Sequence, residues 1–320
     1  MLLFAQESMY WLTGYDTFGF CFFQCLVVTS DGRKVLLTRS ADQRQARHTS
    51  NIADIRIWVD RGEASPVGQL KDLLFEMDLL GSKLGVEYDT HGMTGAIGIE
   101  LEAQLTSFAE LKDASRLIPM LRAIKSPAEI AYVRKAAELA DNAYDAAMAE
   151  IRPGADEGRI LATMQGAIFE GGGDYPGNEF IIGSGRDALL CRYQSGRRLL
   201  KDNDQLTLEW AGAYRHYHAA LMRTVIVGTP TSRHQEMYAA ARDALAAVET
   251  KLRPGFTFGD IFEAHAAAVD AHDMMAHRLN ACGYSLGARF TPSWMDPPMA
   301  YKDNPSPVEP NMVIFQHMIL

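Results

Sequence analysis

An internal repeat is the feature that most constrains the fold of this chain. The segment IRPGADEGRI (Ile151–Ile160) recurs later as LRPGFTFGDI (Leu252–Ile261). Each copy joins two helical segments, and a glycine-rich extended segment follows the second of them. One half alone would leave a hydrophobic face exposed, so the repeat predicts a pseudo-symmetric α/β unit around a central sheet. A cleft between the two halves of this unit is then a natural place for a site.

The termini of the first long helix are well marked. Ser126, Pro127 and Glu129 have the pattern of a capping box with proline in the first turn, and Arg152-Pro153-Gly154 ends the helix. The sequence therefore predicts a helix over 126–151. By the same repeat, helices are expected over 156–170, 232–252 and 258–272, and extended segments over 180–185 and 282–287.

The residues before this helix predict a smaller mixed-sheet α/β domain. Apolar runs indicate strands over 21–28, 34–38, 55–59 and 83–86, and helical spacing indicates helices over 66–80 and 94–104. Residues 1–16 predict a strand with nothing before it to pair with. Residues 312–320 predict a strand without a return strand.

Composition excludes several classes of protein. The net charge of −9 and the lack of a basic cluster argue against a nucleic-acid partner. No long apolar run or secretion signal is present, so no membrane partner is expected. Four scattered cysteines do not form a disulfide framework, which favours reduced thiols and a cytoplasmic location.

A hairpin over Asp204–Gly228 carries the residues most suited to chemistry. Gln205–Ala211 alternates polar and apolar residues, Gly212-Ala213 is expected as the turn, and a second strand follows. Glu209 lies on one face of the first strand, and His216 and His218 are expected to share a face of the second. A carboxylate and two imidazoles would then face one cavity.

Two further segments resemble a known family. RAIKSPAEIAYVRKAAELAD (Arg122–Asp141) and WLTGYD (Trp11–Asp16) are similar to the start of the catalytic domain and the close of the first strand in the creatinase/prolidase/methionine aminopeptidase family. The order of segments matches over nearly the whole chain. The resemblance implies a pita-bread fold after the mixed-sheet domain, in a homodimer. We expect domains over 1–118, incomplete at its start, and 119–320, lacking its last hairpin.

The departures from that family bear on its metal site. Metal-dependent members use two aspartates, a histidine and two late glutamates. The resemblance places Glu209, Ala220, Tyr284 and His317 at the first four positions, and the fifth would lie beyond Leu320. Alanine supplies no ligand and neutral tyrosine is a poor one, so the substitutions argue against a site with two cations. No cofactor is therefore expected.

The predicted function is metal-independent hydrolysis of a C–N bond in a small zwitterionic amide or amidine, as in creatinase- or ectoine-hydrolase-like members. Glu209 or His218 would activate water, and His317 and Tyr284 would donate hydrogen bonds to the developing oxyanion. The expected substrate-binding residues are Arg192, which stands at the position of a further family histidine, together with Arg223 and His216.

Other interpretations remain open from the sequence. A single divalent metal would be held at a rebuilt site of Glu209, His216, His218 and His317. The chain would then be a metal-dependent Xaa-Pro dipeptidase or aminopeptidase. A separate alternative is a non-catalytic pita-bread module that binds a ligand or partner. Glu209 would serve only structure if it were paired with Arg223, as would Tyr284 in a core.

Overall fold

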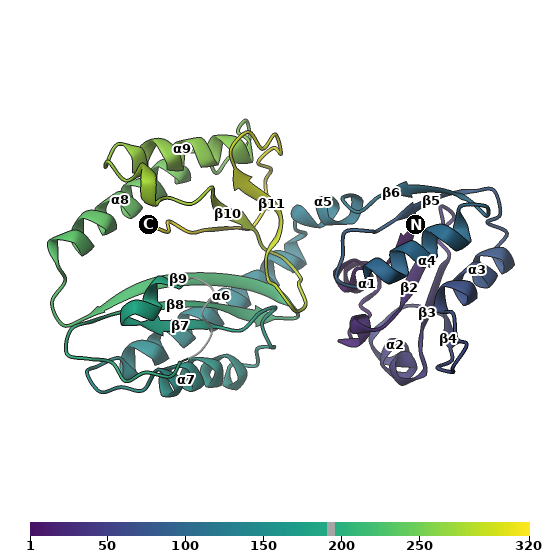
Figure 1. Cartoon of the computed structure of the whole chain (residues 1–320), viewed down its shortest axis with the longest axis horizontal. Coiled ribbons are helices and arrows are strands. Elements are labelled where there is room, and N and C mark those ends of the chain that lie inside the picture. The colour runs from purple at the N-terminus through teal and green to yellow at the C-terminus, as the bar shows by residue number, and fades with distance from the viewer. Residues whose placement is uncertain (191–195) are drawn as a thin grey trace. The chain divides into compact units, whose positions relative to one another are not determined.

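The computed structural model describes residues 1–190 and 196–320, which form two compact units, Met1–Leu121 and Arg122–Leu320 (Figure 1). Each unit has its own sheet structure and its own apolar core. None of the helices in the described ranges is both long and apolar enough to cross a membrane.

The first unit is built on a six-stranded mixed sheet in the order β4-β3-β2-β1-β5-β6. The β1–β2 and β2–β3 pairs are antiparallel, and the other pairs are parallel. Apolar side chains of α3 and α4 form a core with one set of strand residues, and those of α1 and α2 lie in a second core. The strands are β1 (Leu2–Leu3), β2 (Cys25–Val28), β3 (Lys34–Arg39), β4 (Asp54–Trp58), β5 (Lys83–Val86) and β6 (Glu110–Asp113), and the helices are α1 (Gln6–Thr13), α2 (Gln43–Thr49), α3 (Pro66–Glu76) and α4 (Gly95–Leu105). Helix α5 (Leu117–Ala123) contains the last residues of this unit and the first two of the second.

The opening segment differs from its prediction as a long strand. Only β1 is extended, and it lies inside the sheet between β2 and β5. The carboxylate of Glu87 accepts hydrogen bonds from the backbone N–H groups of Phe4 and Ala5, both at 3.0 Å, which ends the strand. Helix α1 follows and ends at Gly14, whose φ of 81° suits a glycine cap. The motif WLTGYD therefore closes a helix, and its assignment to a strand was wrong.

The second unit contains the two halves that the repeat predicts. Each half has two helices, and each carries one three-stranded antiparallel sheet, with strand orders β7-β8-β9 and β11-β10-β12. The strands lie between the α6–α7 pair and the α8–α9 pair (Figure 1). The elements are α6 (Pro127–Glu150), α7 (Glu157–Glu170), β7 (Ile181–Ser184), β8 (Asp204–Tyr214), β9 (Tyr217–Val227), α8 (Ser232–Glu249), α9 (Phe258–Asp270), β10 (Ala281–Ser285), β11 (Asp296–Tyr301) and β12 (Ile314–Gln316).

The turn of the hairpin does not lie at Gly212-Ala213. Strand β8 continues to Tyr214, and the turn is Arg215-His216, with φ values of 51° and 61°. Gly212 serves close packing instead, because an added Cβ would collide with the carbonyl oxygen of Ala136 and lie 2.7 Å from the nitrogen of Ala140 on α6. The segment 312–320 also contains less strand than expected, since only Ile314–Gln316 forms a strand and Met312 makes one isolated bridge to Ile124.

A buried group of charges joins the start of the second unit to its later strands. Arg122 donates to Asp296 at 2.9 Å, and both side chains are almost wholly buried. Lys125 donates to the hydroxyl of Ser285 at 3.3 Å, and Arg289 lies 3.5 Å from Asp296. Burial lowers the pKa of Lys125 to about 8, although the nearby Asp296 carboxylate opposes that shift. One carboxylate thus holds several cations inside the protein.

We predict that Asp296→Asn lowers the free energy of unfolding by about 3–5 kcal/mol, because it leaves buried cations without their counter-charge. The control is Glu138→Gln, which breaks an exposed pair with Lys135 at 3.0 Å and should change that free energy by less than about 0.5 kcal/mol. Urea unfolding of both variants measures the difference. Equal, small effects would contradict a structural role for the buried charges.

Candidate active site

The register of the hairpin defines which of its residues share a face. Directly opposite residues of an antiparallel pair point to the same side, and Glu209 lies opposite Met222 while Ala213 lies opposite His218. Trp210 and Gly212 point the other way, since the Trp210 indole donates to the Ala140 carbonyl of α6 at 2.9 Å. Glu209 and His218 therefore both lie on the face turned away from α6, which we call the inner face.

His218 is wholly buried, and its ring joins two other segments of the backbone. The N–H of Gly177 donates to Nε2 at 2.8 Å, and Nδ1 lies 3.3 Å from the carbonyl oxygen of Gly287. This arrangement requires a neutral ring with its proton on Nδ1. Burial lowers the pKa of His218 to about 4, so the ring stays neutral at physiological pH. Neither nitrogen is available to take a proton from water.

His216 does not share a strand face with His218, because it forms the turn. Its backbone N–H donates to the Asp174 carboxylate at 3.1 Å, and its ring stacks on Phe290 with 4.1 Å between the ring centres. The prediction of two imidazoles on one strand face was wrong. It followed from placing the turn three residues too early.

Tyr284 lies on β10 and belongs to the same apolar core as Ala220, Phe315 and Trp294. Its phenol oxygen accepts a hydrogen bond from the Trp294 indole at 2.9 Å. Ala220 lies directly opposite Ala211, and therefore on the inner face. Ala220 and Tyr284, which the sequence resemblance places at the second and third ligand positions, are thus part of one packed core.

His317 follows β12, and its backbone N–H donates to the carbonyl of Cys282 at 2.9 Å. The ring lies beside Tyr284, with 5.7 Å between the ring centres. Within residues 1–190 and 196–320, its Nδ1 atom is buried without a hydrogen-bond partner. Burial lowers the pKa of His317 to about 4, with a smaller contribution from His265. His317 is therefore a neutral imidazole next to the Tyr284 ring.

The structure does not place Arg223, one of the predicted substrate-binding residues, at this site. Arg223 lies opposite Leu208, on the other face of the hairpin from Glu209, and is exposed. Its guanidinium donates to the carbonyl of its neighbour Met222 at 2.7 Å. It is therefore poorly placed to bind a substrate beside Glu209. Arg192 lies outside the described residues.

The donor set on the inner face does not fit the metal centre that the family resemblance implies. In the part of the chain that the structure describes, no three or more His, Cys, Asp and Glu side chains are grouped so that they could hold a metal ion. Ala220 has no donor atom, and both ring nitrogens of His218 are engaged with the backbone. With His216 in the turn, the alternative of a single metal at Glu209, His216, His218 and His317 is not assembled either.

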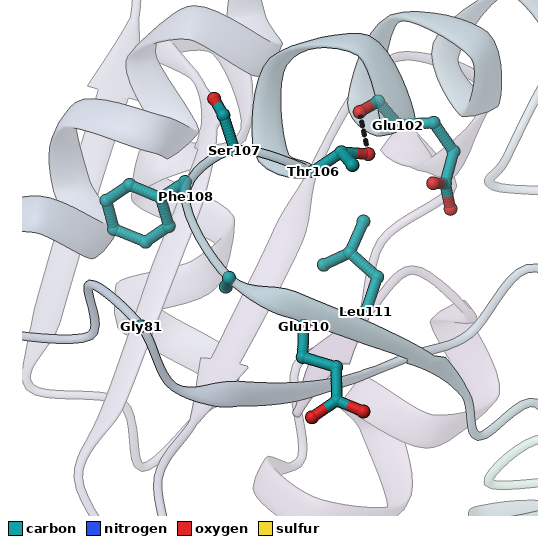
Figure 2. Close-up of a pocket in the computed structure, with 8 residues that line it drawn as sticks. Gly81, Glu102, Thr106, Ser107, Phe108, Glu110 and Leu111 are labelled. Carbon is teal, nitrogen blue, oxygen red and sulfur yellow. Dashed lines mark hydrogen bonds between the residues drawn. The ribbon is translucent and has the colours of Figure 1, made fainter.

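A separate cavity of about 520 Å³ lies in the first unit, beside the end of α4 and strand β6 (Figure 2). Figure 2 shows Glu102 and Glu110 on its two sides and Phe108 in the connection between them. It is lined by Gly81, Glu102 and residues 106–111, and contains no residue of the predicted site.

Sequence reasoning missed the residues that hold the inner face in place. Trp294 contacts Tyr284, and the loop with Gly177 and Asn178 contacts both His218 and Trp294. These residues lie in irregular segments, where hydrophobic periodicity gives no signal. The only local sequence signal was the presence of Pro176, Pro292 and Pro297 near these residues, since proline restricts the backbone of a loop.

Comparison with known proteins identifies relatives over most of the chain. The model of metallopeptidase family M24 matches residues 131–318, and that of the creatinase/prolidase N-terminal domain matches residues 1–124. Ectoine hydrolase of Halomonas elongata is 27% identical over 96% of this chain and 80% of its own length. An uncharacterized hydrolase/peptidase of Sinorhizobium fredii is 30% identical, covering 92% of this chain and 77% of its own.

Solved structures agree in fold. A recombinant prolidase from Thermococcus sibiricus aligns with a TM-score of 0.85 at 20% identity, over 97% of this chain and 82% of its own. An X-Pro aminopeptidase from Thermotoga maritima aligns with a TM-score of 0.83 at 17% identity, over the same shares. The fold is therefore a mixed-sheet N-terminal domain followed by a pita-bread-like domain, as predicted. The chain belongs to metallopeptidase family M24 and is a hydrolase that acts on C–N bonds.

Proposed function

We propose that this chain is a metal-independent hydrolase that cleaves a C–N bond in a small zwitterionic amide or amidine. The observation that carries the proposal is the composition of the inner face. It has a carboxylate at Glu209 and, on the same face, Ala220, where the sequence resemblance places the family's second metal-binding aspartate. Tyr284 and His317, beside one another, offer hydrogen-bond donors in place of two further ligands.

Such a reaction needs a base and fixed donors. Glu209 takes a proton from water as the water oxygen adds to the amide or amidine carbon. The Tyr284 phenol donates a hydrogen bond to the oxygen on which negative charge develops. This is the carbonyl oxygen of an amide, or the oxygen added from water as an amidine's tetrahedral intermediate collapses. When the tetrahedral intermediate collapses, the C–N bond breaks, its electron pair stays on nitrogen, and Glu209 returns the proton to that nitrogen.

The neutral state of His317 suits a donor of the same kind. A neutral imidazole carries one N–H and can donate it without adding a buried positive charge. Its position beside Tyr284 would let both groups reach one developing oxyanion. Arg192 remains the candidate for binding a substrate carboxylate, and a homodimer and the cytoplasm remain the expected assembly and location.

The relatives support this substrate class in part. Ectoine hydrolase matches nearly the whole chain, and ectoine is a small zwitterionic cyclic amidine. A Xaa-Pro dipeptidase of Pyrococcus furiosus is 25% identical over 62% of this chain, which makes Xaa-Pro dipeptides the alternative substrate to test.

We predict that Glu209→Gln lowers kcat for ectoine hydrolysis at least 100-fold with KM changed less than about threefold, because the amide cannot act as the base. Glu138→Gln, at an exposed helix position, is the matched control and should retain full turnover. Release of product is followed by chromatography. Full turnover by Glu209→Gln would show that Glu209 is not the base.

Metal dependence is tested on protein purified without chelators. We expect fewer than about 0.2 equivalents of Mn, Co, Zn or Fe per chain, and ectoine turnover that is unchanged by excess EDTA. Elemental analysis and the same turnover assay give both values. Cleavage of an Xaa-Pro dipeptide that EDTA abolishes and Mn²⁺ or Co²⁺ restores would contradict metal independence.

The proposal gives His218 a structural role, and the pH dependence of stability tests it. An unfolded histidine titrates near pH 6.5, whereas folded His218 stays neutral to about pH 4. As the pH falls below about 6.5 the unfolded state binds the proton first, so the free energy of unfolding decreases until about pH 4.

We therefore predict that His218→Gln loses roughly 1–2 kcal/mol less stability than the wild type between pH 7 and pH 5. His277→Gln, an exposed position, should keep the wild-type dependence. Urea unfolding at both pH values measures it. If His218→Gln retains the full wild-type loss, His218 is not the neutral buried group described above.

A further inference from the structure

We propose that Trp294 is a positioning residue that fixes the Tyr284 phenol as a hydrogen-bond donor for the reaction. This inference rests on the proposed function, in which Tyr284 donates to the developing negative charge. It assigns a role to a residue outside the hairpin and outside the family ligand positions.

The hydrogen bond between Trp294 and Tyr284 has only one possible direction. Both side chains are buried, and 2.9 Å separates the indole nitrogen from the phenol oxygen. An indole N–H can only donate, so the phenol oxygen must accept. The hydrogen of the phenol must then point away from Trp294. The contact therefore sets the phenol as a donor toward a different group.

The backbone of Trp294 is held by a neighbouring loop. The backbone N–H of Trp294 donates to the side-chain oxygen of Asn178 at 3.2 Å. The backbone of Gly177 lies flat against the same segment, because an added Cβ would be 2.8 Å from the Trp294 nitrogen. The N–H of Gly177 donates to His218. A continuous set of contacts thus runs from the buried histidine of the hairpin to the phenol.

We expect these contacts to affect the rate of catalysis more than the stability of the protein. A donor that is already oriented stabilises charge in the transition state without reorganisation, whereas a phenol free to rotate must first be ordered. Phenylalanine at position 294 would keep most of the packing but remove the N–H. Its effect should therefore appear mainly in kcat.

The first test compares two buried tryptophans. Trp210 also donates its indole N–H at 2.9 Å, but to the Ala140 carbonyl on the face toward α6. We expect Trp294→Phe to lower kcat for ectoine about tenfold with little change in KM, and Trp210→Phe to lower the melting temperature without that loss. Trp294→Phe with kcat within twofold of wild type would overturn the proposal.

A double-mutant cycle and a readout without turnover complete the test. In a Tyr284→Phe background, Trp294→Phe should have almost no further effect on kcat, and additive losses would overturn the role. In the NMR spectrum of ¹⁵N-tryptophan-labelled protein, the indole N–H signal that Trp294→Phe removes is assigned to Trp294. Tyr284→Phe should shift this signal and speed the hydrogen exchange of the indole N–H. If this signal does not change, the proposal is overturned as well, whether or not ectoine is a substrate.

If Trp294→Phe fails to fold, Asn178→Ala takes its place, because it removes the group that holds the Trp294 backbone. It should lower kcat and speed exchange of the same indole signal. Wild-type values for both would overturn the proposal. Failure of the proposed function looks different: wild-type protein then turns over no ectoine while the Trp294 indole signal still responds to Tyr284→Phe.

Discussion

The second unit depends on one buried carboxylate. Asp296 lies at the start of β11 and neutralises two arginines. Arg122 is at the start of the unit, and Arg289 is in the segment that contacts the hairpin turn. Lys125 adds a further cation that bonds to Ser285, the residue next to Tyr284. Buried charges tolerate little displacement, because each must keep its partners. The strand that carries Tyr284 is thereby tied to the first residues of its own domain.

The polar residues of the hairpin serve either the structure or the proposed chemistry. His218 binds two backbone segments and cannot act as a base, and His216 shapes the turn. Glu209 is left as the acidic residue of the inner face, with Tyr284 and His317 as its candidate partners. The fold of the family is kept, while the described residues contain no cluster of His, Cys, Asp and Glu side chains that could hold a metal ion.

Much of the fold was predictable from local chemistry. The capping box at Ser126 and Glu129 forms as expected, and the repeat locates helices α6, α7, α8 and α9. The errors occurred where tertiary contacts decide. Gly212 reads as a turn residue, but its missing side chain allows close contact with α6. Likewise Trp294 carries no sequence signal for its contact with Tyr284, because that contact depends on how an irregular segment packs against strand β10.

The turn of the hairpin has a consequence for how the protein folds. Arg215 and His216 both adopt positive φ, a conformation that costs non-glycine residues roughly 1–2 kcal/mol each. Contacts with Asp174, Arg289 and Phe290 compensate that cost, and they come from segments far along the chain. The turn therefore depends on contacts from outside the hairpin. Strands β8 and β9 would form a less stable hairpin in isolation than they do within the folded unit.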